Sequence, residues 1–282
     1  VQAAGFAVVR ASIDRNARAQ IARALDLDEN IWRRLLDQNA EQLRQGSALL
    51  AADYGFRSAV NSGDEETIQS VLENHGSRIG AAVTALLATD LELRAVSLSD
   101  SMEQFPATLR QVVPRLAQQP QGSQIAVMDG VPYQFVMVPM RAPVVIGWVL
   151  MGFRIDQSRA DEMRQLLSVH VALMIKSPEG AMTLSVSTLP ADARALLLST
   201  GGAAGELQTV EGTLLARSSK LDSVGGEVHS LLLRSVDEVV APYRQLQVLL
   251  AIITVAGVLL FAAGTGLVAQ RLTTPLRSLL AA

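Results

Sequence analysis

The chain has 282 residues, no cysteine, a formal charge of −3 and a pI near 5.7. The absence of cysteine excludes a disulfide scaffold, a thiol nucleophile and any cysteine metal site. The small negative charge gives no electrostatic footprint for nucleic acid, so no nucleic-acid partner is expected.

The first residues, "VQAAGFAVV", form a short apolar run before Arg10. The run is too short to cross a bilayer, which takes about 20 apolar residues. We interpret residues 1–11 as the end of a truncated first membrane helix, and an ordinary helix start is the alternative.

Residues 12–80 are expected to form a helical spine. From about Ser12 to Leu50, apolar residues recur at steps of three and four with charged residues between them: Ile21, Leu25, Ile31, Trp32, Leu35, Leu36 and Leu43. Such a helix would be roughly 60 Å long, more than one core requires. We therefore expect it to pack on the following domains and, through Ile21, Leu25, Trp32 and Leu35, on a partner helix in a homodimer. A capping box of Ser62 and Glu65 predicts the next helix, with Gly76 at its end.

Residues 81–156 and 157–240 repeat one order of elements: two strands, a helix and three strands. The first set is predicted at Val83–Ala88, Leu91–Leu98, Pro106–Gln118, Ser123–Met128, Tyr133–Met140 and Val144–Ile155. The second set is predicted at Val169–Lys176, Met182–Val186, Pro190–Ser199, Glu206–Val210, Thr213–Lys220 and Glu227–Leu233, after a helix at Gln157–Leu167. The fold class is therefore α+β, with two tandem modules that each hold a five-stranded antiparallel sheet.

Residues 246–269, "LQVLLAIITVAGVLLFAAGTGLVA", contain no charged side chain. They are long enough to cross a bilayer as a helix, so we expect a transmembrane helix with lipid as its partner. A buried core helix is the alternative. Arg271 and Arg277 follow with no acidic residue near them, which favours a cytoplasmic C-terminus and an external domain before the span.

The residues after the span resemble the start of a HAMP linker, to which we assign residues 270–282. The resemblance rests on Arg271, Thr273, Thr274, Pro275 and Leu276. It implies a relay from an external sensor to a cytoplasmic signalling domain in a bacterium.

Two longer segments, "ALLAADYGFRSAVNSGDEETIQSVLENHGSRIGA" and "VPYQFVMVPMRAPVVIGWVLMGFRID", resemble double Cache sensor domains. These PAS-like domains belong to bacterial receptors, and the similar subfamily often precedes cyclic-di-GMP enzymes with GGDEF and EAL domains. The resemblance implies that residues 81–156 are the membrane-distal module and residues 157–240 the membrane-proximal one. It also implies a periplasmic sensor held in the inner membrane. The Arg-Tyr-Asp motif of amino-acid-binding relatives is not found, which argues against an amino-acid ligand.

Candidate ligand-binding residues lie on two neighbouring predicted strands. Tyr133 and Met137 share one face by the two-residue period, and Trp148 lies on the next strand. Arg141 and Arg154 would supply positive charge to an anionic ligand. Core packing is the alternative for Met137, and a solvated edge position is the alternative for the arginines.

No motif for catalysis or phosphate binding is present, and His75, His170 and His229 lie far apart in the sequence. We therefore expect no enzyme, no metal and no cofactor in this region. The predicted function is ligand sensing for a cytoplasmic cyclic-di-GMP synthase or phosphodiesterase. The alternatives are the sensor of a histidine kinase or chemoreceptor, or a non-catalytic envelope assembly module.

Overall fold

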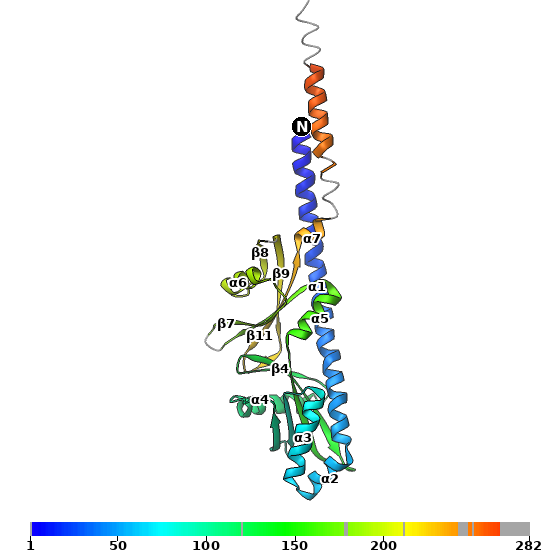
Figure 1. Cartoon of the computed structure of the whole chain (residues 1–282), viewed down its shortest axis with the longest axis vertical. Coiled ribbons are helices and arrows are strands. Elements are labelled where there is room, and N and C mark those ends of the chain that lie inside the picture. The colour runs from blue at the N-terminus through cyan, green and yellow to red at the C-terminus, as the bar shows by residue number, and fades with distance from the viewer. Residues whose placement is uncertain are drawn as a thin grey trace, which may run out of the picture. The chain divides into compact units, whose positions relative to one another are not determined.

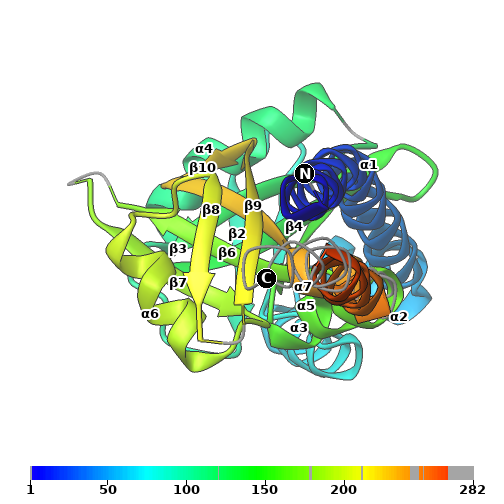
Figure 2. The ribbon, with the colours of Figure 1, turned by 90° about the horizontal axis from the view of Figure 1, so that it is seen from above.

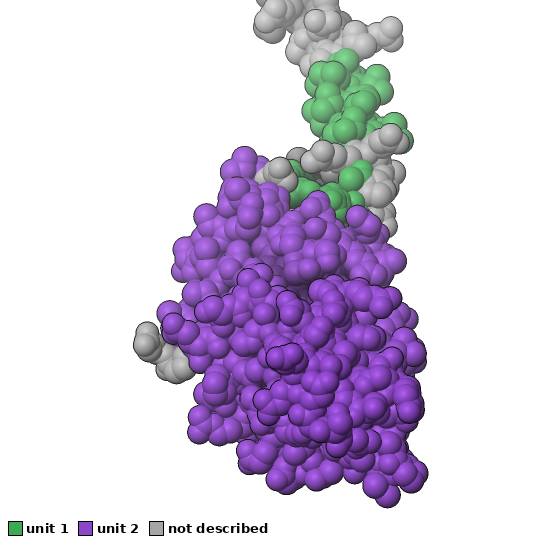
Figure 3. All heavy atoms as spheres, turned by 60° about the horizontal axis from the view of Figure 1, so that its bottom comes forward, with its two compact units in different colours: residues 1–23, 211–213, 235–282 green, residues 24–210, 214–234 purple. Residues whose placement is uncertain are grey.

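The computed structural model describes residues 2–119, 121–177, 180–210, 212–241, 248–249 and 251–265. The chain divides into two compact units (Figure 3). The first comprises Val1–Arg23, Glu211–Thr213 and Ser235–Ala282, and the second comprises Ala24–Val210 and Leu214–Arg234. Most of both sheets and every candidate ligand-binding residue belong to the second unit.

Three helices come first in the chain. The long helix α1 spans Gln2–Ala52, so it starts earlier than the predicted helix and ends close to its predicted end (Figure 1). It is followed by α2 (Tyr54–Ser62) and α3 (Glu65–Ile79). The predicted order of a long helix followed by a capped helix is therefore correct, and the short helix α2 lies between them in the chain.

The predicted caps of α3 are wrong at both ends. The side chain of Asp64, not Ser62, is the N-cap, and its carboxylate accepts a hydrogen bond from Thr67 N at 3.1 Å. A carboxylate at this position also interacts favourably with the helix dipole. Gly76 lies inside the helix, which ends at Gly80 with a φ of 71°. That left-handed conformation suits glycine, which has no Cβ.

One strand of the first sheet, β10 (Ser223–Val224), comes from later in the chain, and the rest of the sheet is built, with one helix, from the chain segment before residue 155. Its elements are β1 (Val83–Leu87), β2 (Leu93–Leu98), α4 (Phe105–Gln118), β3 (Gln124–Met128), β4 (Val131–Arg141) and β5 (Val145–Arg154). The order of strands is β10-β3-β4-β5-β1-β2. The strand β5 therefore has neighbours on both sides, as its apolar sequence predicted.

The turn between β3 and β4 is the predicted Asp-Gly hairpin. Asp129 and Gly130 have φ values of 50° and 74°. Positive φ at both central residues is typical of the type I′ turn, whose twist matches that of the strands it joins.

The first sheet has six strands, and the prediction of five is wrong. The additional strand β10 (Ser223–Val224) pairs in parallel with Ile125–Ala126 of β3. It comes from a loop of the second module, between the strands predicted at Thr213–Lys220 and Glu227–Leu233, where no strand was predicted. Ser223 Oγ holds this loop, because it donates to Gly226 O at 2.8 Å and accepts from Val228 N at 3.1 Å.

The second sheet has the five predicted strands in the order β7-β6-β11-β9-β8. It follows α5 (Gln157–Leu167), and its elements are β6 (His170–Lys176), β7 (Met182–Ser187), α6 (Ala191–Ser199), β8 (Gly205–Thr209), β9 (Gly212–Leu221) and β11 (Glu227–Ser235). The helix α6 covers one face through Ala193 and Leu197 (Figure 2). In the first unit, α7 spans Val236–Val240.

The first sheet buries both of its faces. On one face, Val136 and Met140 of β4 join the side chains of α2 and α3 and the end of α1 in an apolar core. On the opposite face, Phe135 and Met137 of β4 pack against α4. The alternation of neighbouring residues between two cores explains why β4 is almost continuously apolar.

Residues 251–265 are helical. Within the described ranges, no helix combines the length and the hydropathy that a membrane span requires. The predicted span at 246–269 lies partly outside these ranges, and the predicted linker at 270–282 lies wholly outside them.

Candidate ligand-binding site

The face of the first sheet that α4 covers carries three of the five predicted residues. Tyr133, Met137 and Trp148 belong to one apolar cluster with Phe105 and Val112 of α4. The two-residue period of the strands therefore placed these side chains on the same face, as expected. Tyr133 and Met137 are buried, and Trp148 is half-buried.

Tyr133 lies at one end of this face, directly opposite Arg154 of β5. Its ring centroid is 6.4 Å from that of Phe135, at an interplanar angle of 45°. Burial raises the pKa of the Tyr133 phenol, and the nearby charge of Arg154 opposes that rise. The phenol is therefore a neutral donor at physiological pH beside an exposed cation.

Trp148 lies towards the other end of the same face, opposite Pro139. Six residue steps along β5 separate it from Arg154, which corresponds to about 20 Å. Arg141 is at that far end too, exposed, with its carbonyl oxygen accepting a hydrogen bond from Arg57 Nη1 at 3.0 Å. A small molecule cannot contact both ends of a strand pair of this length.

The five predicted residues therefore form two groups rather than one site. Tyr133 and Arg154 are together, Trp148 and Arg141 are near one another, and Met137 lies between the groups. The sequence predicted that Tyr133 and Met137 share a face, whereas the pairing register of β4 with β5 had to be known to see this separation.

Arg154 also borders a cavity that the sequence analysis missed. The cavity lies between α1, the neighbouring ends of β4 and β5, and α5, and its lining includes Trp32, Asn39 and Gln134. Gln134 was a usable signal, because it is an amide within an otherwise apolar strand, "VPYQFVMVPM". Trp32 gave no such signal, because a tryptophan is expected on the apolar face of the long helix.

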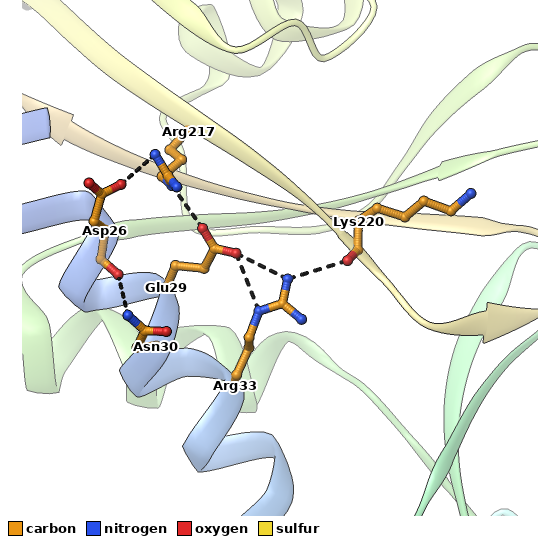
Figure 4. Close-up of polar contacts among 6 residues, drawn as sticks. All are labelled: Asp26, Glu29, Asn30, Arg33, Arg217 and Lys220. Carbon is orange, nitrogen blue, oxygen red and sulfur yellow. Dashed lines mark hydrogen bonds and ion pairs between the residues drawn. The ribbon is translucent and has the colours of Figure 1, made fainter.

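An ionic cluster joins α1 to β9 of the second sheet (Figure 4). Arg217 forms ion pairs with Asp26 and with Glu29, the latter at 2.7 Å, and Arg33 binds Glu29 at 3.0 Å. Burial alone would raise the pKa of Glu29, but the hydrogen bonds from Arg217 and Arg33 outweigh it and lower the pKa. The cluster therefore ties the spine helix to the second sheet, and the lowered pKa keeps the Glu29 carboxylate ionised at neutral pH.

Among the described residues, no group of three or more histidines or carboxylates is arranged to hold a metal ion. A family model described as the double sensory domain of two-component sensor kinases, dCache_3, matches residues 18–231. The chain belongs to this family. The match covers both sheets, and it makes this dCache_3 region a sensor of a signalling receptor rather than a catalytic domain.

Several solved sensor domains are similar to this dCache_3 domain at low sequence identity. The ligand-binding domain of the Pseudomonas fluorescens chemoreceptor CtaA, solved with L-isoleucine, is 12% identical, with a TM-score of 0.40 over 79% of this chain and 98% of that one. The sensor domain of the V. cholerae histidine kinase DctB is 15% identical, with a TM-score of 0.39 over 76% and 95%. The periplasmic domain of Vibrio cholerae LuxQ is 13% identical, with a TM-score of 0.37 over 79% and 98%. The curated proteins give no significant match.

Proposed function

We propose that this chain is the periplasmic sensing region of a bacterial inner-membrane receptor and binds a small molecule in its first, membrane-distal module. The observation that carries the proposal is the family match across both sheets, residues 18–231. A ligand that prefers one of two conformations shifts their populations, and that shift is the signal. In this proposal residues 1–11 and 246–269 lie in the bilayer, and residues 270–282 begin the HAMP relay.

The proposed output is a cyclic-di-GMP enzyme, and a histidine kinase is the second candidate. The description of the family, which names two-component sensor kinases, favours the second. Adding a ligand to cells that carry the intact receptor distinguishes them, because one output changes cyclic-di-GMP and the other changes phosphotransfer.

The α4 face of the first sheet is the proposed ligand site. A small ligand would contact one of two groups on this face, either Tyr133 with Arg154 at one end or Trp148 with Arg141 at the other, and Met137 lies between the groups. Both aromatic residues combine an apolar ring with a hydrogen-bond donor, which suits recognition of a partly polar molecule. Since α4 packs on this face, binding would require α4 to move.

The first prediction uses two substitutions that keep an aromatic ring and remove the donor. We expect one of Tyr133→Phe and Trp148→Phe, the one at the end that the ligand occupies, to weaken ligand binding by about tenfold, because a hydrogen bond at a buried site contributes about 1–2 kcal/mol. The other substitution should leave the affinity unchanged. The measurement is a ligand-dependent thermal shift of the purified chain in detergent. Unchanged affinity in both variants would contradict the site.

Homodimerisation through the N-terminal helix is also proposed, but on a different face from the one predicted. Leu25 and Trp32 are each 3% exposed and face the interior of their own chain, so they cannot form the seam. Leu27 and Ile31, one helical turn apart, are 65% and 40% exposed. Two apolar side chains at this spacing fit a partner helix.

The second prediction is that Leu27→Cys forms a disulfide-linked dimer when the receptor is in the membrane. The chain contains no other cysteine, so any crosslink reports the introduced thiol. Ala22→Cys is the matched control, because Ala22 is also exposed but lies roughly 140° around the helix. Equal crosslinking at both positions, or none at Leu27, would show that this face is not the interface.

A further inference from the structure

The cavity between α1 and α5 lies within the second unit and has a volume of about 100 Å³. Its walls are partly apolar, from Leu35, Leu36, Phe153 and Met163. None of its lining residues comes from α4, and Arg154 at its edge is the one residue that it shares with the α4 face proposed as the ligand site.

Two polar atoms on α1 are buried in this wall without a partner in the part of the chain that the structure describes. They are the indole Nε1 of Trp32 and the side-chain oxygen Oδ1 of Asn39. Trp32 is 3% exposed. Buried donors and acceptors nearly always have hydrogen-bond partners, so an unpaired donor and an unpaired acceptor about two turns apart on α1, in the wall of one cavity, point to a ligand.

The orientation of the Asn39 amide follows from its neighbours. Gln134 Nε2 donates to Leu36 O at 3.0 Å and to Ser123 Oγ at 3.1 Å. The side-chain oxygen Oε1 of Gln134 is therefore a hydrogen-bond acceptor, and it accepts a hydrogen bond from Asn39 Nδ2 at 2.8 Å. Because the Asn39 amino group is committed to Gln134, the buried oxygen Oδ1 of Asn39 is left as an acceptor in the wall of the cavity.

The charges around the cavity leave one cation available. Arg159 pairs with Glu162 at 3.3 Å. Arg154 has no ion-pair partner among the residues described here, and it is exposed at the cavity's edge. An unpaired guanidinium favours an anion, and its planar fork suits a carboxylate.

We propose that this cavity binds a small hydroxy-carboxylate with a short branched apolar tail. The carboxylate would accept from Trp32 Nε1 and from Arg154, the hydroxyl would donate to Asn39 Oδ1, and the tail would fill the apolar part. A cavity of about 150 Å³ accommodates a benzene-sized molecule, so the apolar part of the ligand is limited to about four or five carbons. A neutral hydroxyl fits better than an ammonium group, because the one carboxylate in the lining, Glu162, is already paired.

The test compares four probes on the purified chain in detergent: 2-hydroxyisovalerate, isovalerate, valine and isobutanol. We expect 2-hydroxyisovalerate to bind saturably and at least tenfold more tightly than the other three. Isovalerate lacks the hydroxyl, isobutanol lacks the carboxylate, and valine replaces the hydroxyl with a charged donor. Absence of binding by 2-hydroxyisovalerate, or equal or tighter binding of any other probe, would overturn the proposal.

Fluorescence gives a direct readout at the site, because the chain has two tryptophans. In a Trp148→Phe background Trp32 is the remaining one, and its emission should change during the titration with 2-hydroxyisovalerate. Asn39→Ala in this background should weaken the titration at least tenfold. Tyr133→Phe should leave it unchanged, which separates this cavity from the α4 face. A titration unaffected by Asn39→Ala, or abolished by Tyr133→Phe, would overturn the assignment.

Discussion

Replacing Arg234 with methionine is expected to lower the free energy of unfolding by about 2–4 kcal/mol at neutral pH. Arg234 of β11 pairs with Asp28 of α1 at 3.2 Å, and its Nη2 also donates to Leu167 O at 3.0 Å. Loss of one partner leaves the other charge buried and unpaired, which costs about 3–5 kcal/mol in a fully buried pair. The expected value is lower because the Arg234 side chain is 24% exposed.

The effect should depend on pH in a defined direction. Burial raises the pKa of Asp28 despite the opposing charge of Arg234. A group whose pKa is higher in the folded state contributes most stability below its unfolded pKa, and the contribution is lost as pH rises through the folded value. Without Arg234 the folded pKa rises further, so the loss in the variant should grow as the pH is raised from 5 to 7.5.

Urea unfolding of the Arg234→Met variant at pH 5 and pH 7.5 measures this difference. Asp28→Asn is the control, because it removes the buried charge and keeps a similar shape. Adding Asp28→Asn to Arg234→Met should recover much of the stability at pH 7.5. A loss that is equal at both pH values, with no recovery in the double variant, would show that the unpaired carboxylate is not its cause.

The second large effect is expected at Gly225, the turn residue after β10. Its φ is 75°, and a Cβ there would lie 2.5 Å from the carbonyl oxygen of Val127. We expect Gly225→Ala to destabilise the chain by about 2–5 kcal/mol, the sum of about 1–2 for the left-handed conformation and about 1–3 for the overlap. The overlap cannot be relieved by rotating a side chain, because the obstructing atom belongs to the backbone of β3.

Gly130 is a matched control for this substitution. Its φ is 74°, and no atom lies within 4 Å of the position of its Cβ. The loss of stability in Gly130→Ala should therefore equal the cost of the left-handed backbone conformation alone, about 1–2 kcal/mol. The measurement is chemical denaturation, combined with hydrogen exchange at the amides of β10 and β3. Equal losses in the two variants would mean that the contact with Val127 is unimportant.

The features that the sequence predicted well depend on local patterns. The strands of both sheets follow from alternation and apolar runs, and the Asp129–Gly130 turn follows from the φ preferences of two residues. The features that it did not predict depend on distant partners. The strand β10 is two residues long and exists because β3 is beside it, roughly a hundred residues earlier in the chain.

The candidate sites also depend on partners that are distant in the sequence. The sequence indicated that Tyr133 and Met137 share a face and that Trp148 lies on the next strand, but the register of β4 with β5 determines that about 20 Å separates Tyr133 from Trp148. Trp32 was predicted as an apolar spine residue, and its burial agrees with that. Its unpaired Nε1 is visible only once α1, β5 and α5 are in place around the cavity.

The position of β10 has a consequence for synthesis on the ribosome. The strand β3 can form a hairpin with β4 as soon as both have emerged, but its other edge receives Ser223–Val224 only after most of the second sheet has been translated. During that interval the nascent chain presents an unpaired edge, which is a template for intermolecular pairing. A gene fragment ending near residue 156 would keep that edge open permanently. Such a fragment should therefore aggregate more readily than the chain that continues through residue 235.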